Sequence, residues 1–447
     1  MTDVNDELIV EGKDQLHRSV QLLLLLSRTE FSVDAKRQIT GEFEVFSSWK
    51  LFAWLAVRHG VAALVWQNIS DLDLAEKVPE TERTLLEGLR FKSIARVAWI
   101  SETAAGVCAL LEKKGIRVVL LKGLALEHTV YGSRGLRQMS DADLLVAPTD
   151  ALRARDILTG DGFRSMPLKS PLYKHIILDL GNHLPEMHRG GISVDLHYRL
   201  FGPEAEESVA RAVAEADTIV AGNEHFRVLP PVIAFLALVS HIYKHEVKGE
   251  FQLRLWVDIY LLLCKYGSSI LTGELYAAAE EAGIADETRT VLTVMEKVWD
   301  IRIPPEIRGL TGNSGTTGGR GTFSDGRDMA VAEDAELRRG IEEVPVGAED
   351  TGTPDEEKIA ARFMHDLMHP GSVVPLSQRE MFRRNLKALK SPGKKLIFIL
   401  GDIFPSVGFM KHRYGCRSSL KALLFYPHRL GKLAWVLGLS GTNNRDI

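Results

Sequence analysis

The tripeptide Asp141-Ala142-Asp143 is the part of the sequence whose residue types and spacing point most directly to chemistry. It lies in SDADLLVAP, where Asp141, Asp143 and Leu145 alternate with apolar residues until Pro148. Such alternation is typical of a β-strand, on which successive residues of one face are about 6.5 Å apart. Two carboxylates on one face can together hold a pair of divalent cations roughly 3.5–4 Å apart.

Two neighbouring features place the tripeptide in a plausible site. Lys122-Gly123 ends IRVVLLKG, a short β-branched apolar run that predicts a buried strand, and a short helix, LALEHTVYG, is expected after it. Asp195 lies inside ISVDLHYRL, an apolar strand in which a carboxylate without a partner would be costly. The three carboxylates and the glycine turn together predict one catalytic site.

The dipeptide Gly190-Gly191 predicts a hairpin between two antiparallel strands, around YKHIILDL and GISVDLHYRL. A two-residue turn would place Glu186 opposite Asp195, and would place His188 opposite Ser193 on the face that also carries His197. Zinc held by His188, Asp195 and His197 is one interpretation of this face. Hydrogen bonds that support the site, or a polar strand face, are the more common use of such residues.

A second histidine pair, His241 and His245, is four residues apart on a predicted helix and would therefore lie on one face. No HExxH pattern accompanies the pair, so we expect a polar helix face that looks toward the cleft. Lys244 or Arg254 could touch phosphate there. Asp258 is expected to pair with a nearby arginine.

These motifs resemble the nucleotidyltransferase superfamily of DNA polymerase β, which uses a strand, a glycine turn, a helix, a D-x-D strand and a third carboxylate on a later strand. The stretch LLKGLALEHTVYGSRGLRQMSDADLLV, followed by HLPEMH and VDLHYRL, is similar to an uncharacterised bacterial nucleotidyltransferase-like family. SHIYKHEV, LRLWVDIYLLL and IFPSVGFMKHRYG also fit that family's pattern.

The resemblance implies a role for each site residue. Asp141 and Asp143 would hold Mg²⁺, with two ions expected, and Asp195 would bind the catalytic metal and activate the acceptor. Gly123 would let the backbone approach the triphosphate of an NTP substrate. The fold implied is α+β, with a small mixed-sheet polymerase-β-like nucleotidyltransferase core between helical N-terminal and C-terminal regions.

The turn departs from the superfamily pattern, because Lys122-Gly123 replaces the usual Gly-Ser and seventeen residues separate Gly123 from Asp141. Lys122 could supply a point charge to the nucleotide, and Ser140 could supply a hydroxyl. Arg137 could clamp a phosphate through two hydrogen bonds. A surface salt bridge is the alternative for Arg137.

The leading hypothesis is a Mg²⁺-dependent nucleotidyltransferase that moves a nucleoside monophosphate, for example from ATP, to a small-molecule or modified-peptide acceptor in a biosynthetic reaction. A catalytically inactive nucleotide-binding or scaffold protein with the same fold is the main alternative. An enzyme that modifies nucleic acid is less favoured, and so is a zinc hydrolase. The basic C-terminal region is expected to be a solvated helical face.

Charge, cysteine content and the length of apolar runs indicate the cellular compartment. The 447 residues carry a net charge of −4, which argues against a protein that coats nucleic acid. Three cysteines lie far apart without a CxxC pair, which predicts a reducing compartment. The acidic N-terminus does not resemble a signal peptide, and no apolar run reaches about 18 residues. A cytoplasmic protein without a transmembrane segment is expected.

The pattern along the chain predicts five regions. Residues 311–358 are rich in glycine and carry 12 acidic against 5 basic side chains, which indicates a disordered linker or insertion, whereas residues 359–447 carry 15 basic against 4 acidic ones. Gly60 is expected to end a helix in the first region. The predicted regions are a helical N-terminal region (1–105), the nucleotidyltransferase core (106–228), a helical domain (229–310), the acidic linker (311–358) and a basic helical region (359–447).

Overall fold

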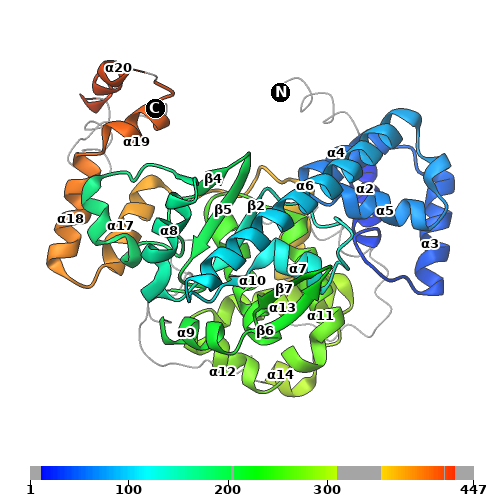
Figure 1. Cartoon of the computed structure of the whole chain (residues 1–447). Helices are drawn as coiled ribbons and strands as arrows, with labels where there is room; N and C mark the ends of the chain where they lie inside the picture. The colour runs from blue at the N-terminus through cyan, green and yellow to red at the C-terminus, as the bar shows by residue number, and fades with distance from the viewer. Residues whose placement is uncertain (1–11, 203–205, 310–353, 417, 428–447) are drawn as a thin grey trace.

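The computed structural model describes residues 12–202, 206–309, 354–416 and 418–427, and the chain forms a mixed α/β structure (Figure 1). All seven described strands fall between Val119 and Val228, and helices precede and follow them. The predicted α+β class with a small mixed sheet is therefore confirmed.

The sheet has the strand order β3-β4-β5-β2-β1-β7-β6. β2 runs parallel to β5, and β1 runs antiparallel to β2 and parallel to β7, so the sheet is mixed. The strands are β1 (Val119–Leu120), β2 (Asp141–Leu145), β3 (Arg164–Ser165), β4 (Met187–Arg189), β5 (Ile192–His197), β6 (Asp217–Ala221) and β7 (Glu224–Val228).

The hairpin of β4 and β5 has the predicted turn and register. Gly190 and Gly191 both have positive φ, 59° and 83°, which a two-residue turn of this kind requires. His188 pairs with Ser193 as expected. The predicted strand around YKHIILDL is wrong, because the segment forms two short 3₁₀ helices, η3 (Pro171–His175) and η4 (Ile177–Asp179). Ser170 caps η3, and Pro171 starts it.

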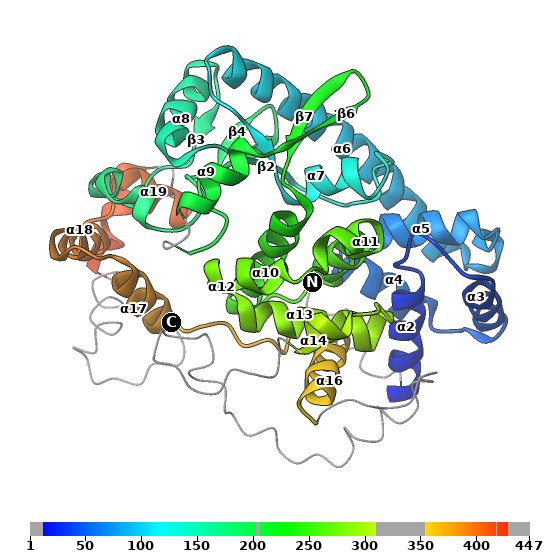
Figure 2. The same cartoon turned by 90° about the horizontal axis from the view of Figure 1, so that it is seen from below.

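The two faces of the sheet pack against different sets of helices (Figures 1 and 2). Ala142, Leu144 and Val146 belong to one hydrophobic cluster with residues of α6 (Glu80–Lys113) and α8 (Ala151–Gly160). The opposite face, which includes Leu145, belongs to a second cluster that contains the helices α10 (Pro231–Val247) and α11 (Leu253–Ile270). The predicted alternation along β2 is thus confirmed.

The second cluster joins helices from distant parts of the sequence into one hydrophobic core. Gly60 ends α4 with a φ of 71°, and its N–H donates to the Val57 carbonyl, as expected for a C-cap. The helices of this core are α2 (Lys13–Leu25), α3 (Val33–Val45), α4 (Trp49–Arg58), α5 (Ala62–Asp71), α10 (Pro231–Val247), α11 (Leu253–Ile270), α12 (Glu274–Glu281), α13 (Ala285–Trp299) and α16 (Pro354–Met368).

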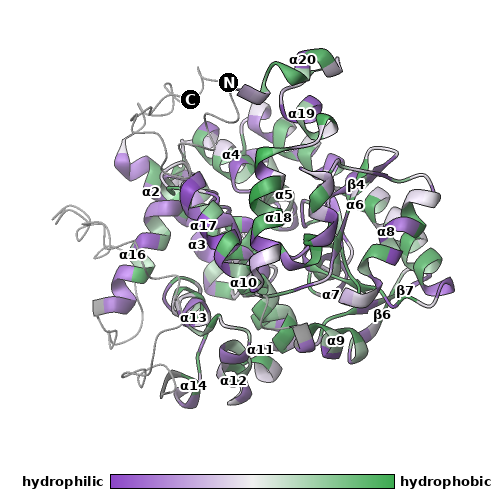
Figure 3. Cartoon of the chain, turned by 90° about the vertical axis from the view of Figure 1, so that its left-hand side faces the viewer, coloured by the Kyte–Doolittle hydropathy of each residue, from purple (hydrophilic) through white to green (hydrophobic). Residues whose placement is uncertain are grey.

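The C-terminal helices pack on the sheet domain from another side. Phe382 of α17 (Gln378–Ala388) and Phe398 of α18 (Pro392–Ile403) form a small cluster with Ile176. Figure 3 shows that α17 is largely hydrophilic, whereas α18 carries a long hydrophobic stretch. The remaining helices are α7 (Lys122–Thr129), α9 (Glu206–Ala214), α14 (Pro305–Gly309), α19 (Val407–Arg413) and α20 (Ser419–Leu423).

Two helices of the structure extend across predicted region boundaries. α6 spans the boundary at residue 105, and α16 begins at Pro354, inside the predicted linker. The rest of that linker, 311–353, lies outside the described residues. The five-region division of the chain stays a prediction.

Of the described helices, α6 is long and apolar enough to cross a membrane. Its apolar side chains Val97, Ile100 and Val107 instead pack into the cluster beneath the sheet. A core helix of a globular protein passes the same length test, so this finding is weak support for a membrane span. All three cysteines are free.

Candidate active site

Lys122 occupies the centre of the candidate site, at the junction of β1 and α7. Its backbone has a left-handed φ of 48°, which is uncommon outside glycine and is often associated with functional positions. The Leu121 N–H donates to the Asp143 carbonyl and fixes this junction beside β2. From there the Lys122 ammonium reaches the Asp143 carboxylate, with 2.6 Å between Nζ and Oδ1.

Asp143 is buried and is held as a charged carboxylate by two neighbours. The His197 Nε2 lies 2.8 Å from the same Oδ1 atom, and the Lys122 ammonium lies 3.3 Å from that nitrogen. Although burial alone would raise the pKa of Asp143, Lys122 and the hydrogen bond from His197 hold it well below its usual value. Burial and the Lys122 charge lower the pKa of His197 to about 3, so the ring is neutral and donates to Asp143.

Asp195 lies directly beside Asp143, because the parallel register of β2 and β5 pairs these two residues. One of its carboxylate oxygens, Oδ1, is buried and has no hydrogen-bond partner. Burial raises the pKa of Asp195 to about 7, and the charges of Asp143, Asp141 and Glu186 add to this effect. A buried carboxylate oxygen without a partner is costly and is therefore a strong indication of a missing cation or proton.

A metal ion fits these residues. Within the part of the chain that the structure describes, Asp143, Asp195 and His197 form the group whose potential ligand atoms all lie within 4.8 Å of one another. A cation bound there would give the orphaned Asp195 oxygen a partner and would neutralise the adjacent carboxylates. Carboxylates suit Mg²⁺ and Mn²⁺, and an imidazole also suits Zn²⁺, so the donor set indicates a divalent cation without selecting one.

Asp141 lies on β2 one same-face step before Asp143, opposite Ser193 in the register. It is not one of the three residues of the described 4.8 Å group. Ser140 donates a hydrogen bond to its carboxylate, with 3.2 Å between the oxygens. Burial, followed by the charge of Asp143, raises the pKa of Asp141.

Arg137 is buried and binds Asp258 on α11, with 2.7 Å between Nη2 and Oδ2. The expected arginine partner of Asp258 is thereby confirmed, and the pair is a core interaction rather than a surface one. Tyr131 also donates to Asp258. Although burial would lower the pKa of Arg137, Asp258 raises it, so the guanidinium stays charged.

Gly123 is the second residue of α7 and lies against this guanidinium. A Cβ atom built at Gly123 would lie 2.8 Å from Arg137 Nη1 and 3.1 Å from Cζ. A side chain at this position would collide with Arg137, so the glycine permits a close approach. The group that approaches Gly123 in the structure is the Arg137 guanidinium. The expected contact between Gly123 and a triphosphate stays a proposal.

The zinc interpretation of the hairpin face is not favoured by the positions of the histidines. His188 shares a hydrogen bond with Ser193, with 3.0 Å between Nδ1 and Oγ, and does not belong to the described ligand group. His241 and His245 do lie on one face of α10, with ring centroids 4.6 Å apart, but His245 pairs with Glu250. His241 faces the cleft, as predicted for this helix face.

A hydrogen bond that supports the site was one expected use of His197, but its partner, Asp143, was not predicted from the sequence. A signal exists, because Asp195 and His197 are two residues apart on one strand and therefore share a face. The ring of His183 also lies near this centre, with its centroid 5.2 Å from that of His197. His183 precedes the β4 segment by several residues and carries no such spacing signal.

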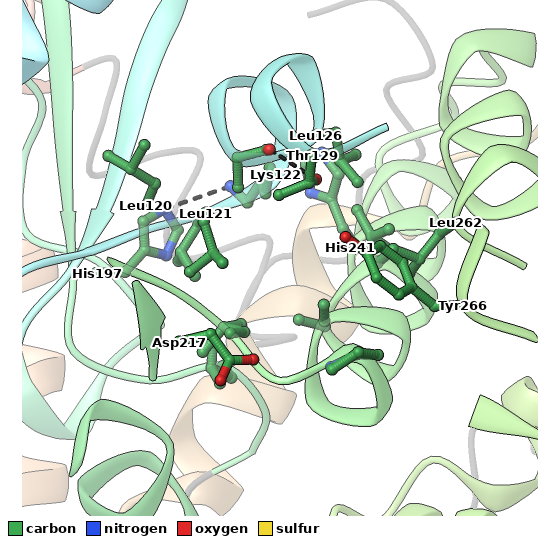
Figure 4. A pocket seen from close by; sticks show the side chains of 18 of the residues that line it. Leu120, Leu121, Lys122, Leu126, Thr129, His197, Asp217, His241, Leu262 and Tyr266 are labelled. Atoms are coloured by element: carbon green, nitrogen blue, oxygen red, sulfur yellow. Dashed lines mark hydrogen bonds between the residues drawn. The ribbon is translucent and has the colours of Figure 1, made fainter. Parts of the chain in front are cut away.

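A cavity adjoins the carboxylate centre and is lined by residues of β1, β5, β6 and β7, of the segment after β5, and of the helices α7, α10 and α11. Lys122 and His197 belong both to its wall and to the Asp143 network (Figure 4). Its volume is about 180 Å³. A ligand in this cavity would therefore lie next to the carboxylates.

The comparisons with known proteins agree with this arrangement. No curated protein matches the chain. The family described as "Uncharacterised nucleotidyltransferase" matches residues 47–300, which is more than half of the chain and includes every described strand and each carboxylate of the site. The protein therefore belongs to this uncharacterised nucleotidyltransferase family.

Proposed function

We propose that the protein is a Mg²⁺-dependent enzyme that transfers a nucleoside monophosphate from an NTP to a small-molecule or modified-peptide acceptor. The observation that supports this most is the pairing of Asp143 with Asp195, which leaves a buried carboxylate oxygen without a partner. A biosynthetic role in the cytoplasm belongs to the same proposal.

The metal ligands in this proposal are Asp143 and Asp195, together with Asp141. His197 orients Asp143 through its Nε2–H. Divalent cations held there, two in our proposal, would neutralise the charge that develops on the phosphate oxygens during transfer.

The reaction requires an acceptor oxygen to attack the α-phosphorus while pyrophosphate leaves. Asp195 is suited to accept a proton from the acceptor, since a base with a pKa near neutrality is efficient at neutral pH. Because the Asp195 carboxylate lies beside Asp143, this proton transfer would occur next to the bound nucleotide.

Lys122 would bind the triphosphate once it is released from Asp143, since a cation at the carboxylates would compete with the ammonium for Oδ1. Gly123 and Ser140 would lie along the same bound triphosphate. Arg137 would contribute to nucleotide binding from behind Gly123, where its charge is already shared with Asp258.

A catalytically inactive nucleotide-binding or scaffold protein is the second candidate, and one observation favours it. Lys122 and His197 already satisfy the Asp143 Oδ1 atom without a metal. A site that has permanently replaced its metal by a lysine would keep the fold and lose the reaction.

One experiment separates the two candidates. The full chain is incubated with each labelled NTP, Mg²⁺ and a metabolite extract, and products are analysed by mass spectrometry. The enzyme proposal expects a product that has gained a nucleoside monophosphate, and expects none from the Asp141→Asn, Asp143→Asn double variant. Equal turnover by a folded double variant would contradict the proposed site.

A further inference from the structure

We infer that the cavity beside the carboxylates binds the acceptor, and that this acceptor is an organic anion carrying an apolar group about the size of a phenyl ring. The inference rests on the proposed function, because it assigns the acceptor of that same reaction. It is carried by the chemistry of the walls, the size of the cavity and the excess of basic over acidic side chains that line it.

The walls of the cavity are mainly aliphatic. Large side chains come from the strands β1 and β7, from the residue that follows β7, and from the helices α10 and α11: Leu120, Val228, Leu229, Leu238 and Leu262. Figure 4 shows Leu120 and Leu121 near Lys122 and His197, whereas Leu262 and Tyr266 lie across the space from them. Apolar walls stabilise an apolar ligand group by removing it from water.

The size of the cavity limits the group that can enter. Its volume of about 180 Å³ is slightly larger than an apolar protein cavity of about 150 Å³ that accommodates benzene. A phenyl ring or a branched five-carbon chain therefore fits. A long acyl chain or a folded peptide exceeds this volume and would not be contained in the cavity.

A nucleobase is a poorer occupant than such a group. Its ring nitrogens and exocyclic groups need hydrogen-bond partners, and burying them without partners is costly. The wall is mainly apolar, and its Thr129 already donates its hydroxyl to the Ala125 carbonyl, although Arg199, Asp217, His241 and Tyr266 also line it. We therefore place the nucleoside outside this cavity, and the ATP-binding measurement below tests that placement.

The wall of the cavity carries more basic than acidic side chains. Lys122, Arg199 and Lys244 line it, against the single acidic lining residue Asp217, and although Lys122 is paired with Asp143, no acidic side chain among the described residues makes an ion pair with Lys244. Surrounding protein atoms and the Lys122 charge lower the pKa of Lys244 to about 7. An anionic oxygen placed there would favour the charged lysine and would lie beside the site of transfer.

An anionic acceptor also makes the reaction simple. A carboxylate or phosphate monoester oxygen forms a bond to the α-phosphorus, the bond between the α-phosphorus and the bridging oxygen breaks, and pyrophosphate leaves with that electron pair. The attacking oxygen is already deprotonated, so no proton has to be removed from it. With such an acceptor Asp195 acts as a metal ligand, and the base role proposed for it above is not needed.

The test measures binding to the full chain without nucleotide or metal, by ligand-observed NMR or calorimetry. The probes are phenylacetate, phenyl phosphate, acetate and the neutral 2-phenylethanol. We expect phenylacetate or phenyl phosphate to bind at least tenfold more tightly than acetate and 2-phenylethanol. The stronger of the two anions identifies the head group. Equal binding of phenylacetate and acetate, with phenyl phosphate no better, would overturn the inference.

Variants locate the binding. Ala234 and Ala237 are half-buried residues of α10 that line the cavity, so Ala234→Leu or Ala237→Leu should fill it and weaken binding at least tenfold. Ala109→Leu, the same change at an exposed position of α6, should alter binding less than twofold. Lys244→Met should weaken binding of the anions and leave that of 2-phenylethanol unchanged. Thermal melts of each variant report whether it is folded.

Two results separate this inference from the proposed function. If phenylacetate binds in the cavity but no NTP is consumed with any acceptor, the cavity stands as a binding site for an organic anion and the transfer reaction fails. If Ala234→Leu weakens ATP binding and leaves phenylacetate binding intact, the nucleoside occupies the cavity. That second result would overturn the acceptor inference while leaving the transfer reaction in place.

Discussion

Replacing Asp195 by asparagine should stabilise the metal-free protein while abolishing turnover. The reason is that ionisation of Asp195 is unfavourable in the folded chain, where burial and the neighbouring carboxylates raise its pKa from 3.8 to about 7. Asparagine has the same shape without the charge. Without metal, the protein with aspartate at position 195 should therefore be less stable than the variant with asparagine there.

The magnitude and the sign follow from the pKa. An acidic group whose pKa is higher in the folded state makes folding less favourable as pH rises. The reason is that this group loses its proton at a lower pH in the unfolded chain than in the folded chain. The penalty is absent below about pH 4 and complete above about pH 7. The full shift corresponds to roughly 4 kcal/mol at about 1.4 kcal/mol per unit. Since Asp195 is partly exposed, we expect about 1–2 kcal/mol.

The assay is thermal and urea unfolding of wild type and Asp195→Asn in EDTA at pH 5 and pH 8. The variant should have the higher midpoint at pH 8, and the difference should shrink at pH 5. Asp156→Asn, an exposed carboxylate on α8, is the control and should change stability by less than about 0.5 kcal/mol. A lower midpoint for Asp195→Asn at pH 8, or a difference that does not depend on pH, would refute this reasoning.

Three further predictions test other parts of the structure. Mg²⁺ or Mn²⁺ should raise the melting temperature of the wild type but not of Asp143→Asn, and an equal rise in both would place the ion elsewhere. Arg137→Leu should cost about 3–5 kcal/mol in urea unfolding because it leaves Asp258 buried without its cation, and the double variant with Asp258→Leu should recover part of that loss. Deletion of residues 311–350, whose acidic, glycine-rich sequence predicts no core, should leave the melting temperature nearly unchanged, whereas loss of soluble protein would show that the segment packs.

The parts of the site that depend on strand periodicity could be predicted from the sequence. β2 alternates apolar and acidic residues, and Asp195 is conspicuous as a carboxylate in an apolar run, so both strands and their carboxylates were identified. The two glycines of the hairpin also determined the register of β4 and β5. In these cases the local sequence contains the whole physical cause.

Other features depend on residues far apart in the chain. The segment of Pro171–Asp179 is apolar enough for a strand, but its Ile176 packs against Phe382 and Phe398 of the C-terminal helices. No local pattern identifies such a partner more than 200 residues away. The hairpin of β6 and β7 was also not predicted. It joins the sheet through one residue pair, Leu120 of β1 with Val228 of β7.

Arg137 shows the same limit at the site itself. Its spacing before Asp141 is compatible with a phosphate clamp. Only the packing of α11 against the loop that carries Arg137 brings Asp258 to the guanidinium. That ion pair and Gly123 are mutually dependent, because the guanidinium fills the space that a side chain would need. Sequence spacing identifies a charged residue near a site, whereas the fold decides whether its charge is already used.

The metal-free arrangement of Lys122 bears directly on whether the site is active. An ammonium within 2.6 Å of Asp143 supplies one positive charge, which compensates one carboxylate, whereas the strand pair brings two carboxylates together with a third adjacent. A site that had replaced its metal by lysine would gain nothing from a second carboxylate with a raised pKa and an orphaned oxygen. The excess of negative charge over the lysine is what a divalent cation would neutralise, and it therefore favours an enzyme over a scaffold.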